Sequence, residues 1–197
     1  MSNLQLVLLK LVIITFLTSC SANVYFERSY YTDPDFKITG HETVAIPSLV
    51  STHTPAGPLS TGIFLNSIPE GLFLDVERPG RVDSLLYANG VYALPNQLPK
   101  PFIADLRQFI SSRFFLVGYI LGWEDACIGQ NGYVKHRVDI YDLHSGKLAW
   151  RLENEVLIDA PDEDEDEGVY FIGSRRSAYE KLAKKTLVKL TDHNKSD

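Results

Sequence analysis

Cysteine is scarce in this sequence, with two among 197 residues, so a scaffold built on several disulfides is excluded. Basic residues are outnumbered, 19 Lys and Arg against 25 Asp and Glu, which argues against a dedicated nucleic-acid binder. No uninterrupted apolar run reaches the roughly 20 residues of a spanning helix, which excludes a multi-span membrane protein. The remaining composition, 45% hydrophobic and 22% charged, is that of one globular domain.

The first twenty residues have the pattern of a secretory targeting segment. A short apolar segment from Leu11 to Leu17 is followed at once by small and polar residues. Leu17-Thr18-Ser19-Cys20 resembles the lipobox of bacterial lipoproteins, in which cleavage precedes a cysteine that carries a diacylglycerol. We therefore expect a signal peptide at 1–19 and a single periplasmic α/β domain at 20–197, held to the membrane by lipidated Cys20. The alternative is an uncleaved helix with Cys20 as an ordinary thiol.

The residue after the lipidated cysteine bears on the destination of the protein. An aspartate there retains enterobacterial lipoproteins in the inner membrane, so Ser21 favours the outer membrane, facing the periplasm. Acylation of Cys20 would leave Cys127 as the one free thiol, which we expect to be buried and inert.

Hydrophobic periodicity predicts both strands and helices. Segments 43–46 and 72–76 are predicted strands, and the nearly continuous apolar run 114–123 is typical of a central strand, with Gly118 and Gly122 indicating a bulge or a close approach. Residues 137–142 and 148–158 alternate around a turn at 144–147, which predicts a hairpin. Leu148, Trp150, Leu152, Val156 and Ile158 are expected on one buried face.

Helices are expected at 82–88, at 101–112 and from about Ser177, where Ser177 and Glu180 fit a capping box. Pro79-Gly80 is expected to break the chain, and residues 48–62 to form a long surface loop. The order of elements predicts an α/β (α+β) fold, a two-layer sandwich of a mixed sheet with a prominent C-terminal hairpin, covered by helices that include the C-terminal one.

A resemblance supports this fold. Residues 31–36 and 43–47 resemble the opening of a family of bacterial lipoproteins of unknown function. The strand at 115–120 and the hairpin 138–150 are similar to the TolB amino-terminal-domain-like superfamily, which holds envelope lipoproteins of the CsgG, PelC and LpoB type. The resemblance implies a non-catalytic envelope module that assembles with an envelope protein partner or as a homo-oligomer, with neither a cofactor nor nucleic acid.

Two other functions stay open. A cell-wall hydrolase could use Cys127 as nucleophile beside His136 or His144, although the segment around Cys127 does not match such a nucleophile motif. The protein could instead bind a cation or a small ligand through the acidic run 162–167, although this run departs from the EF-hand pattern and is more typical of a solvated loop. The histidines show no metal-binding spacing.

The C-terminal segment, in contrast to the acidic run, is rich in basic residues. Between 174 and 197 it carries seven Lys and Arg against three Asp and Glu. This pattern fits a patch for anionic lipid headgroups or an acidic partner, although it is more typical of the solvent face of an amphipathic helix.

Overall fold

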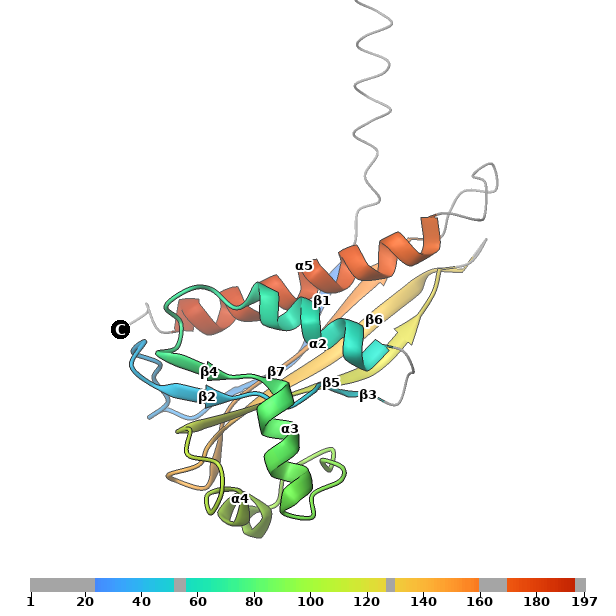
Figure 1. Cartoon of the computed structure of the whole chain (residues 1–197). Helices are drawn as coiled ribbons and strands as arrows, with labels where there is room; N and C mark the ends of the chain where they lie inside the picture. The colour runs from blue at the N-terminus through green and yellow to red at the C-terminus, as the bar shows by residue number, and fades with distance from the viewer. Residues whose placement is uncertain (1–23, 52–55, 127–129, 160–169, 194–197) are drawn as a thin grey trace, which may run out of the picture.

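The computed structural model describes residues 24–51, 56–126, 130–159 and 170–193 (Figure 1). The strands in these ranges are β1 (Tyr25–Thr32), β2 (Thr43–Ala45), β3 (Val50–Ser51), β4 (Asp75–Glu77), β5 (Phe114–Glu124), β6 (Gly132–Asp142) and β7 (Lys147–Ile158). The helices are α2 (Ala56–Ser67), α3 (Pro79–Ala88), α4 (Lys100–Leu106) and α5 (Tyr170–His193). None of the helices in these ranges combines the length and the apolarity needed to cross a bilayer.

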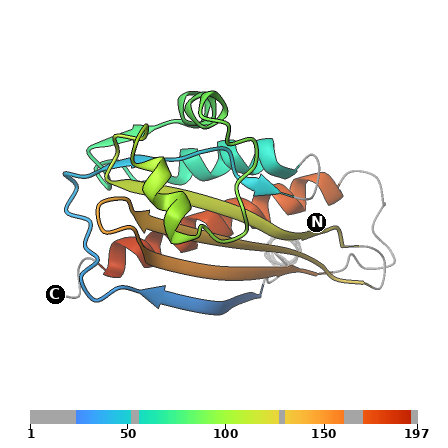
Figure 2. The same ribbon diagram turned by 90° about the horizontal axis from the view of Figure 1, so that it is seen from below.

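The strands form one open, mixed sheet in the order β1-β7-β6-β5-β2-β4, with β3 also paired to β5. The β1, β7, β6 and β5 neighbours are antiparallel, whereas β2 runs parallel to β4 and β5, and β3 parallel to β5. Helices α2 and α5 cover one face, and the shorter α3 and α4 cover the other (Figures 1 and 2). The predicted α+β fold is confirmed, with a third partial layer added by α3 and α4.

The hairpin of β6 and β7 is also confirmed, and its turn is closed by one carboxylate. Asp142 Oδ1 accepts hydrogen bonds from the backbone N–H groups of His144 at 2.7 Å and Ser145 at 3.1 Å. Gly146 completes the turn at φ 68°, a conformation that favours glycine. The turn therefore fixes the pairing of β6 with β7.

One residue of the predicted buried face lies on the opposite side of the sheet. Trp150, Leu152, Val156 and Ile158 pack under α5 as predicted. Leu148 instead packs with the core beneath α3 and α4, so its prediction was wrong. The register between β6 and β7 shifts at this point, and the extra residue of a β-bulge reverses the alternation of side chains.

Helix α5 begins at Tyr170, seven residues before the Ser177 at which it was predicted to start. Ser177 therefore lies inside the helix, and the predicted capping box with Glu180 was wrong. The additional turn is held by tertiary contacts, because Arg175 forms an ion pair with Asp125 and its guanidinium lies over the Trp123 ring. The predicted apolar stripe is confirmed, with each member buried: Tyr179, Leu182, Ala183, Leu187 and Leu190.

The segment 48–62, predicted as a loop, instead contains β3 and the start of α2. Small residues misled the prediction, because they are used here for close packing and not for a turn. Gly57 approaches Leu49, and the buried Thr61 hydroxyl donates to the Gly57 carbonyl while accepting from the Leu49 N–H. Helix α2 is thereby held against β3 and beside α5 (Figure 1).

The second helical layer is built from short elements. Pro79 does not break the chain but opens α3, because proline's fixed φ suits the first helical position. That helix ends at Asn89 and Gly90, as predicted, and Gly90 has a φ of 76°. Helix α4 ends at Leu106, earlier than the predicted 112. Beyond it some backbone bonds span three residues instead of four, as from Phe109 N–H to the Leu106 carbonyl.

The two strand glycines behave as predicted. A Cβ on Gly118 would lie 2.7 Å from Leu49 Cγ, so this glycine permits a close approach of the β2–β3 segment. The register between β5 and β6 shifts between Ile120 and Gly122, which is the predicted bulge.

Candidate functional site

The residues singled out from the sequence as candidate sites lie outside the described residues: Cys20, Cys127 and the acidic run 162–167. The two histidines proposed as partners of Cys127 occupy different environments. His144 is exposed in the hairpin turn, and His136 is buried between β6 and α5 at 1% exposure.

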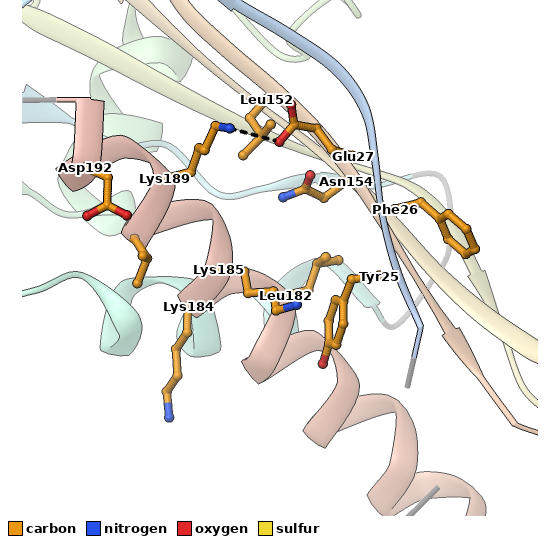
Figure 3. A pocket seen from close by; sticks show the side chains of 11 residues that line it. Tyr25, Phe26, Glu27, Leu152, Asn154, Leu182, Lys184, Lys185, Lys189 and Asp192 are labelled. Atoms are coloured by element: carbon orange, nitrogen blue, oxygen red, sulfur yellow. Dashed lines mark ion pairs between the residues drawn. The ribbon is translucent and has the colours of Figure 1, made fainter. Parts of the chain in front are cut away.

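A groove lies between the edge strand β1 and helix α5. Its volume is about 420 Å³. Figure 3 shows side chains from β1, β7 and α5 around it. The lining residues are Tyr25, Phe26, Glu27, Leu152, Asn154, Leu182, Lys184, Lys185, Val188, Lys189 and Asp192. Apolar walls and a lysine-rich rim give the groove the composition of an interaction site.

Two lysines of the rim are held over tyrosine rings of β1. Lys185 Nζ lies 3.6 Å from the centroid of the Tyr25 ring, and Lys189 Nζ lies 4.9 Å from that of Tyr30. Lys189 also pairs with Glu27 at 3.3 Å. Cation–π contacts stabilise a lysine by about 0.5–1 kcal/mol at exposed sites. These contacts fix the position of positive charge along the groove.

Beneath the groove, three polar side chains form a buried cluster. Thr186 Oγ1 donates to the Leu182 carbonyl at 3.0 Å and accepts from Asn154 Nδ2 at 3.1 Å. His136 Nε2 lies 2.7 Å from the same hydroxyl. Because Thr186 uses its single proton on Leu182, the consistent tautomer has His136 Nε2–H as donor.

Burial dominates the electrostatics of this cluster. It lowers the pKa of His136 from 6.5 to about 3, since a charged imidazolium would lose its hydration there. The Tyr179 ring packs edge-on against His136 at 5.6 Å, and burial raises the pKa of that phenol. A neutral histidine packed this way is a core residue and not an exposed partner for a nucleophile.

On the other face of the sheet, a buried carboxylate gathers two arginines. Asp139 is fully buried and accepts from Arg151 Nε and Nη2, both at 2.7 Å. Arg137 Nε lies 3.4 Å from the same carboxylate, and Tyr141 OH donates to it at 3.3 Å. The hydrogen bond and charge of Asp139 raise the pKa of Arg151 although burial opposes this. The carboxylate is thus enclosed by two guanidinium groups and a phenol, which is the geometry of a structural cluster.

This cluster anchors the loop between α3 and α4. Tyr141 OH accepts from the Leu98 N–H at 3.3 Å, and Tyr119 OH donates to the Pro95 carbonyl at 2.9 Å. Arg137 reaches the Asn96 carbonyl and stacks over the Tyr119 ring, 4.3 Å from its centroid. The loop is thus fixed to the sheet, and it presents a defined surface.

That surface carries an exposed aromatic pair. Tyr87 of α3 and Tyr92 of the following loop are 69% and 75% exposed, and their rings meet edge to face at 5.1 Å. Beside them lies a groove of about 400 Å³, whose lining includes Ser48, Val50 and Asp83. Sequence reasoning missed this pair, although two tyrosines flanking Asn89-Gly90 could have indicated a presented turn.

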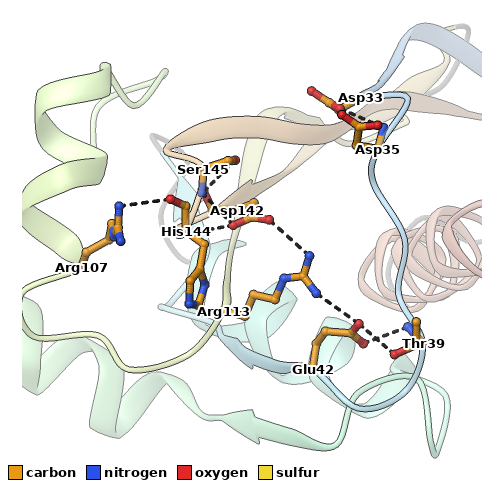
Figure 4. Close-up of polar contacts among 9 residues, drawn as sticks. All are labelled: Asp33, Asp35, Thr39, Glu42, Arg107, Arg113, Asp142, His144 and Ser145. Atoms are coloured by element: carbon orange, nitrogen blue, oxygen red, sulfur yellow. Dashed lines mark hydrogen bonds and ion pairs between the residues drawn. The ribbon is translucent and has the colours of Figure 1, made fainter.

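Carboxylates also gather near the hairpin turn, but an arginine neutralises them (Figure 4). Arg113 lies 3.4 Å from Glu42 and 3.5 Å from Asp142. Burial acts to raise the pKa of Glu42, yet hydrogen bonds from Thr39 and the charge of Arg113 outweigh it and hold that pKa below its usual value. Within the described ranges, no group of three or more His, Cys, Asp or Glu side chains has a metal-binding arrangement.

No protein-family model matches the chain, and no curated protein matches it either. Among solved structures, it is similar to a variant of the PelC dodecamer from Paraburkholderia phytofirmans, with a TM-score of 0.52, 17% identity, and coverage of 85% of this chain and 97% of that one. It is also similar to lipoprotein GNA1162 from Neisseria meningitidis, with a TM-score of 0.48, 12% identity, and coverage of 77% and 99%. The PelC similarity shows a shared fold, so the predicted resemblance is confirmed at that level.

Proposed function

We propose that this protein is a lipid-anchored lipoprotein of the bacterial outer membrane that acts as a non-catalytic assembly module. The lipobox ending in Cys20 supports the anchor, and Ser21 favours the outer membrane. The fold shared with PelC supports an envelope role, because the resemblance seen in the sequence is to envelope lipoproteins of the PelC type. The domain then works at the membrane surface by docking to another protein.

The observation that carries the docking proposal is the Tyr87–Tyr92 pair. Both tyrosines have more than two thirds of their surface exposed, which is uncommon for large aromatic side chains. Burial of such rings stabilises interfaces strongly, so the exposed pair is a candidate contact for a partner. The loop that presents them is fixed by the Asp139 cluster, so docking there needs little ordering of the surface.

A second copy of this chain is the first partner to test, because PelC, which shares the fold, is described as a dodecamer. A repeated contact between identical chains would join the Tyr87–Tyr92 surface of one copy to a different surface of the next. The cell-wall hydrolase interpretation gains no support from the described residues, in which His136 is buried in the core.

Site-specific photocrosslinking in cells tests the proposal. A benzophenone side chain at position 87 or 92 should give one discrete adduct, either a dimer of this chain or a single envelope protein. The matched control places the same group at Leu59, which is 42% exposed on α2 of the opposite face. If positions 87 and 92 give only the diffuse products of position 59, the docking proposal is wrong.

A further inference from the structure

The helical layer formed by α2 and α5 has the opposite charge from the protein as a whole. The complete chain has a formal charge of −6. Helix α2 contains no charged residue. Between residues 175 and 192, α5 carries six basic side chains (Arg175, Arg176, Lys181, Lys184, Lys185 and Lys189) and two acidic ones (Glu180 and Asp192). One broad face is therefore basic, with Lys181, Lys184 and Lys185 exposed on it.

Exposed apolar groups lie beside these lysines. Val188 of α5 is 53% exposed, and Val24 and Tyr30 of the neighbouring edge are 46% and 38% exposed. A surface that rests in a bilayer interface typically combines lysines, tyrosine rings and exposed aliphatic side chains. This face of the protein has all three. By contrast, the groove beside Tyr87 and Tyr92, which Ser48 and Asp83 also line, has no lysine among its described lining residues.

The chain enters the fold at the same place. The Val24 carbonyl accepts a hydrogen bond from the Leu157 N–H at 2.9 Å, which fixes this residue to the sheet at the start of β1. Tyr25, the next residue, lines the groove. Four residue steps separate Val24 from Cys20, a reach of about 14 Å when fully extended. If Cys20 is acylated, as the proposed function holds, the groove lies within that distance of the lipid headgroups.

We propose that the groove between β1 and α5 binds the phosphate headgroup of an anionic phospholipid in the leaflet that holds the anchor. Lys184, Lys185 and Lys189 supply the positive charge, and Val188 and Tyr30 contact the interface. Each basic side chain near an anionic leaflet strengthens binding about fivefold, so three of them fix the orientation of a domain that the anchor already holds nearby. Helix α3 lies on the opposite face of the sheet from α5 (Figure 1), so the Tyr87–Tyr92 pair then faces away from the membrane, toward a protein partner.

Lysine footprinting of the membrane-purified protein tests this orientation. The protein is reconstituted into phosphatidylcholine vesicles, with or without about 30% phosphatidylglycerol. Its lysines are exposed briefly to an amine-reactive reagent, and the extent of modification of each lysine is measured by mass spectrometry. Lys184, Lys185 and Lys189 should react at least about fivefold more slowly in the anionic vesicles. The exposed Lys100 and Lys147 should react equally in both. About 0.5 M NaCl should remove the difference, because the Debye length falls to about 4 Å.

Matched charge variants identify the groove as the cause. The groove variant carries Lys184→Gln, Lys185→Gln and Lys189→Gln, and the control carries Lys37→Gln, Lys100→Gln and Lys147→Gln, with the same change in net charge at exposed positions elsewhere. Lys181, present in both, is the reporter. Its protection by anionic vesicles should persist in the control and disappear in the groove variant. Equal protection in the two variants would overturn the proposal.

Other occupants of the groove give distinct results. Protection that is the same in neutral and anionic vesicles would indicate a second copy or another protein, and it would overturn the headgroup proposal. The intact mass of the same preparation reports acylation of Cys20 separately. If Cys20 is unmodified, the proposed function fails. Flotation of that unacylated chain with vesicles then tests the headgroup proposal by itself. Recovery with anionic vesicles alone supports the proposal, and equal recovery with both vesicle compositions overturns it.

Discussion

Acidification should destabilise this protein through one buried histidine. His136 has a native pKa of about 3, against 6.5 for an unperturbed imidazole, because burial disfavours its charged form. Between these values the unfolded chain binds a proton that the native chain does not. The stabilisation is therefore complete above pH 6.5 and is lost progressively as the pH falls toward 3.

The magnitude follows from the two pKa values. Lowering the pH from about 7.5 to about 5 should reduce the free energy of unfolding by about 2 kcal/mol through this residue alone. Among the described residues, the ring contacts the uncharged side chains of Thr186 and Tyr179, and burial is the cause of its lowered pKa. The result is a pH dependence well above the ionisation range of ordinary carboxylates.

Urea unfolding at several pH values, followed by tryptophan fluorescence, measures this effect. His136→Gln retains a donor toward Thr186 but has no charge to gain, so its stability should change about 2 kcal/mol less than that of the wild type across the same range. His144→Gln is the matched control, because His144 is exposed in the hairpin turn. If His136→Gln and the wild type respond identically to pH, the histidine titrates normally and its assigned burial is wrong.

Three further substitutions test the packing, each by its effect on the free energy of unfolding. Trp150→Ala should cost about 3–5 kcal/mol, because the side chain is fully buried, and an unchanged midpoint would refute the register of β7. Gly132→Ala should cost about 1–3 kcal/mol, since its Cβ would clash with the backbone nitrogen of Ala126, whereas Gly62→Ala, with open space in α2, should be neutral or stabilising. Arg151→Ala should cost about 3 kcal/mol by leaving a buried carboxylate short of its main partner, while Arg28→Ala, at an exposed ion pair, should leave the free energy of unfolding nearly unchanged.

The sequence was most informative where one period of hydrophobicity decides the structure. The continuous apolar run of β5 and the alternation in β6 and β7 both correspond to strands covered by helices, and the stripe of α5 is buried as its spacing predicts. Leu148 escaped this reasoning because a single-residue bulge reverses the pattern, and nothing local marks that bulge.

Small residues were the second source of error. In the segment 48–62 they indicated a loop, yet they allow α2 to pack closely on β3 and the residues before it. Propensity cannot separate a glycine used for a turn from one used for close approach, since both need only the missing side chain. The early start of α5 has a similar cause, because the contact of Arg175 with Asp125 and Trp123 joins residues far apart in sequence.

The candidate surfaces were predictable only in part. The basic character of α5 is visible in the sequence, and a lipid headgroup patch was one of its interpretations. That β1 lies beside α5 and completes a groove with Tyr25 depends on the pairing of β1 with β7, a contact between segments far apart in the sequence. The Tyr87–Tyr92 pair likewise acquires its meaning from the loop anchored by Asp139, which local sequence does not reveal.

The intact mass of the protein purified from its own membranes tests the central claim most directly. The account predicts a chain that begins at Cys20 and carries acyl groups on that residue, together with loss of both processing and acylation in Cys20→Ala. A chain that retains residues 1–19, or a Cys20→Ala variant that is processed and partitions into detergent like the wild type, would contradict the claim that this domain is a lipid-anchored module of the cell envelope.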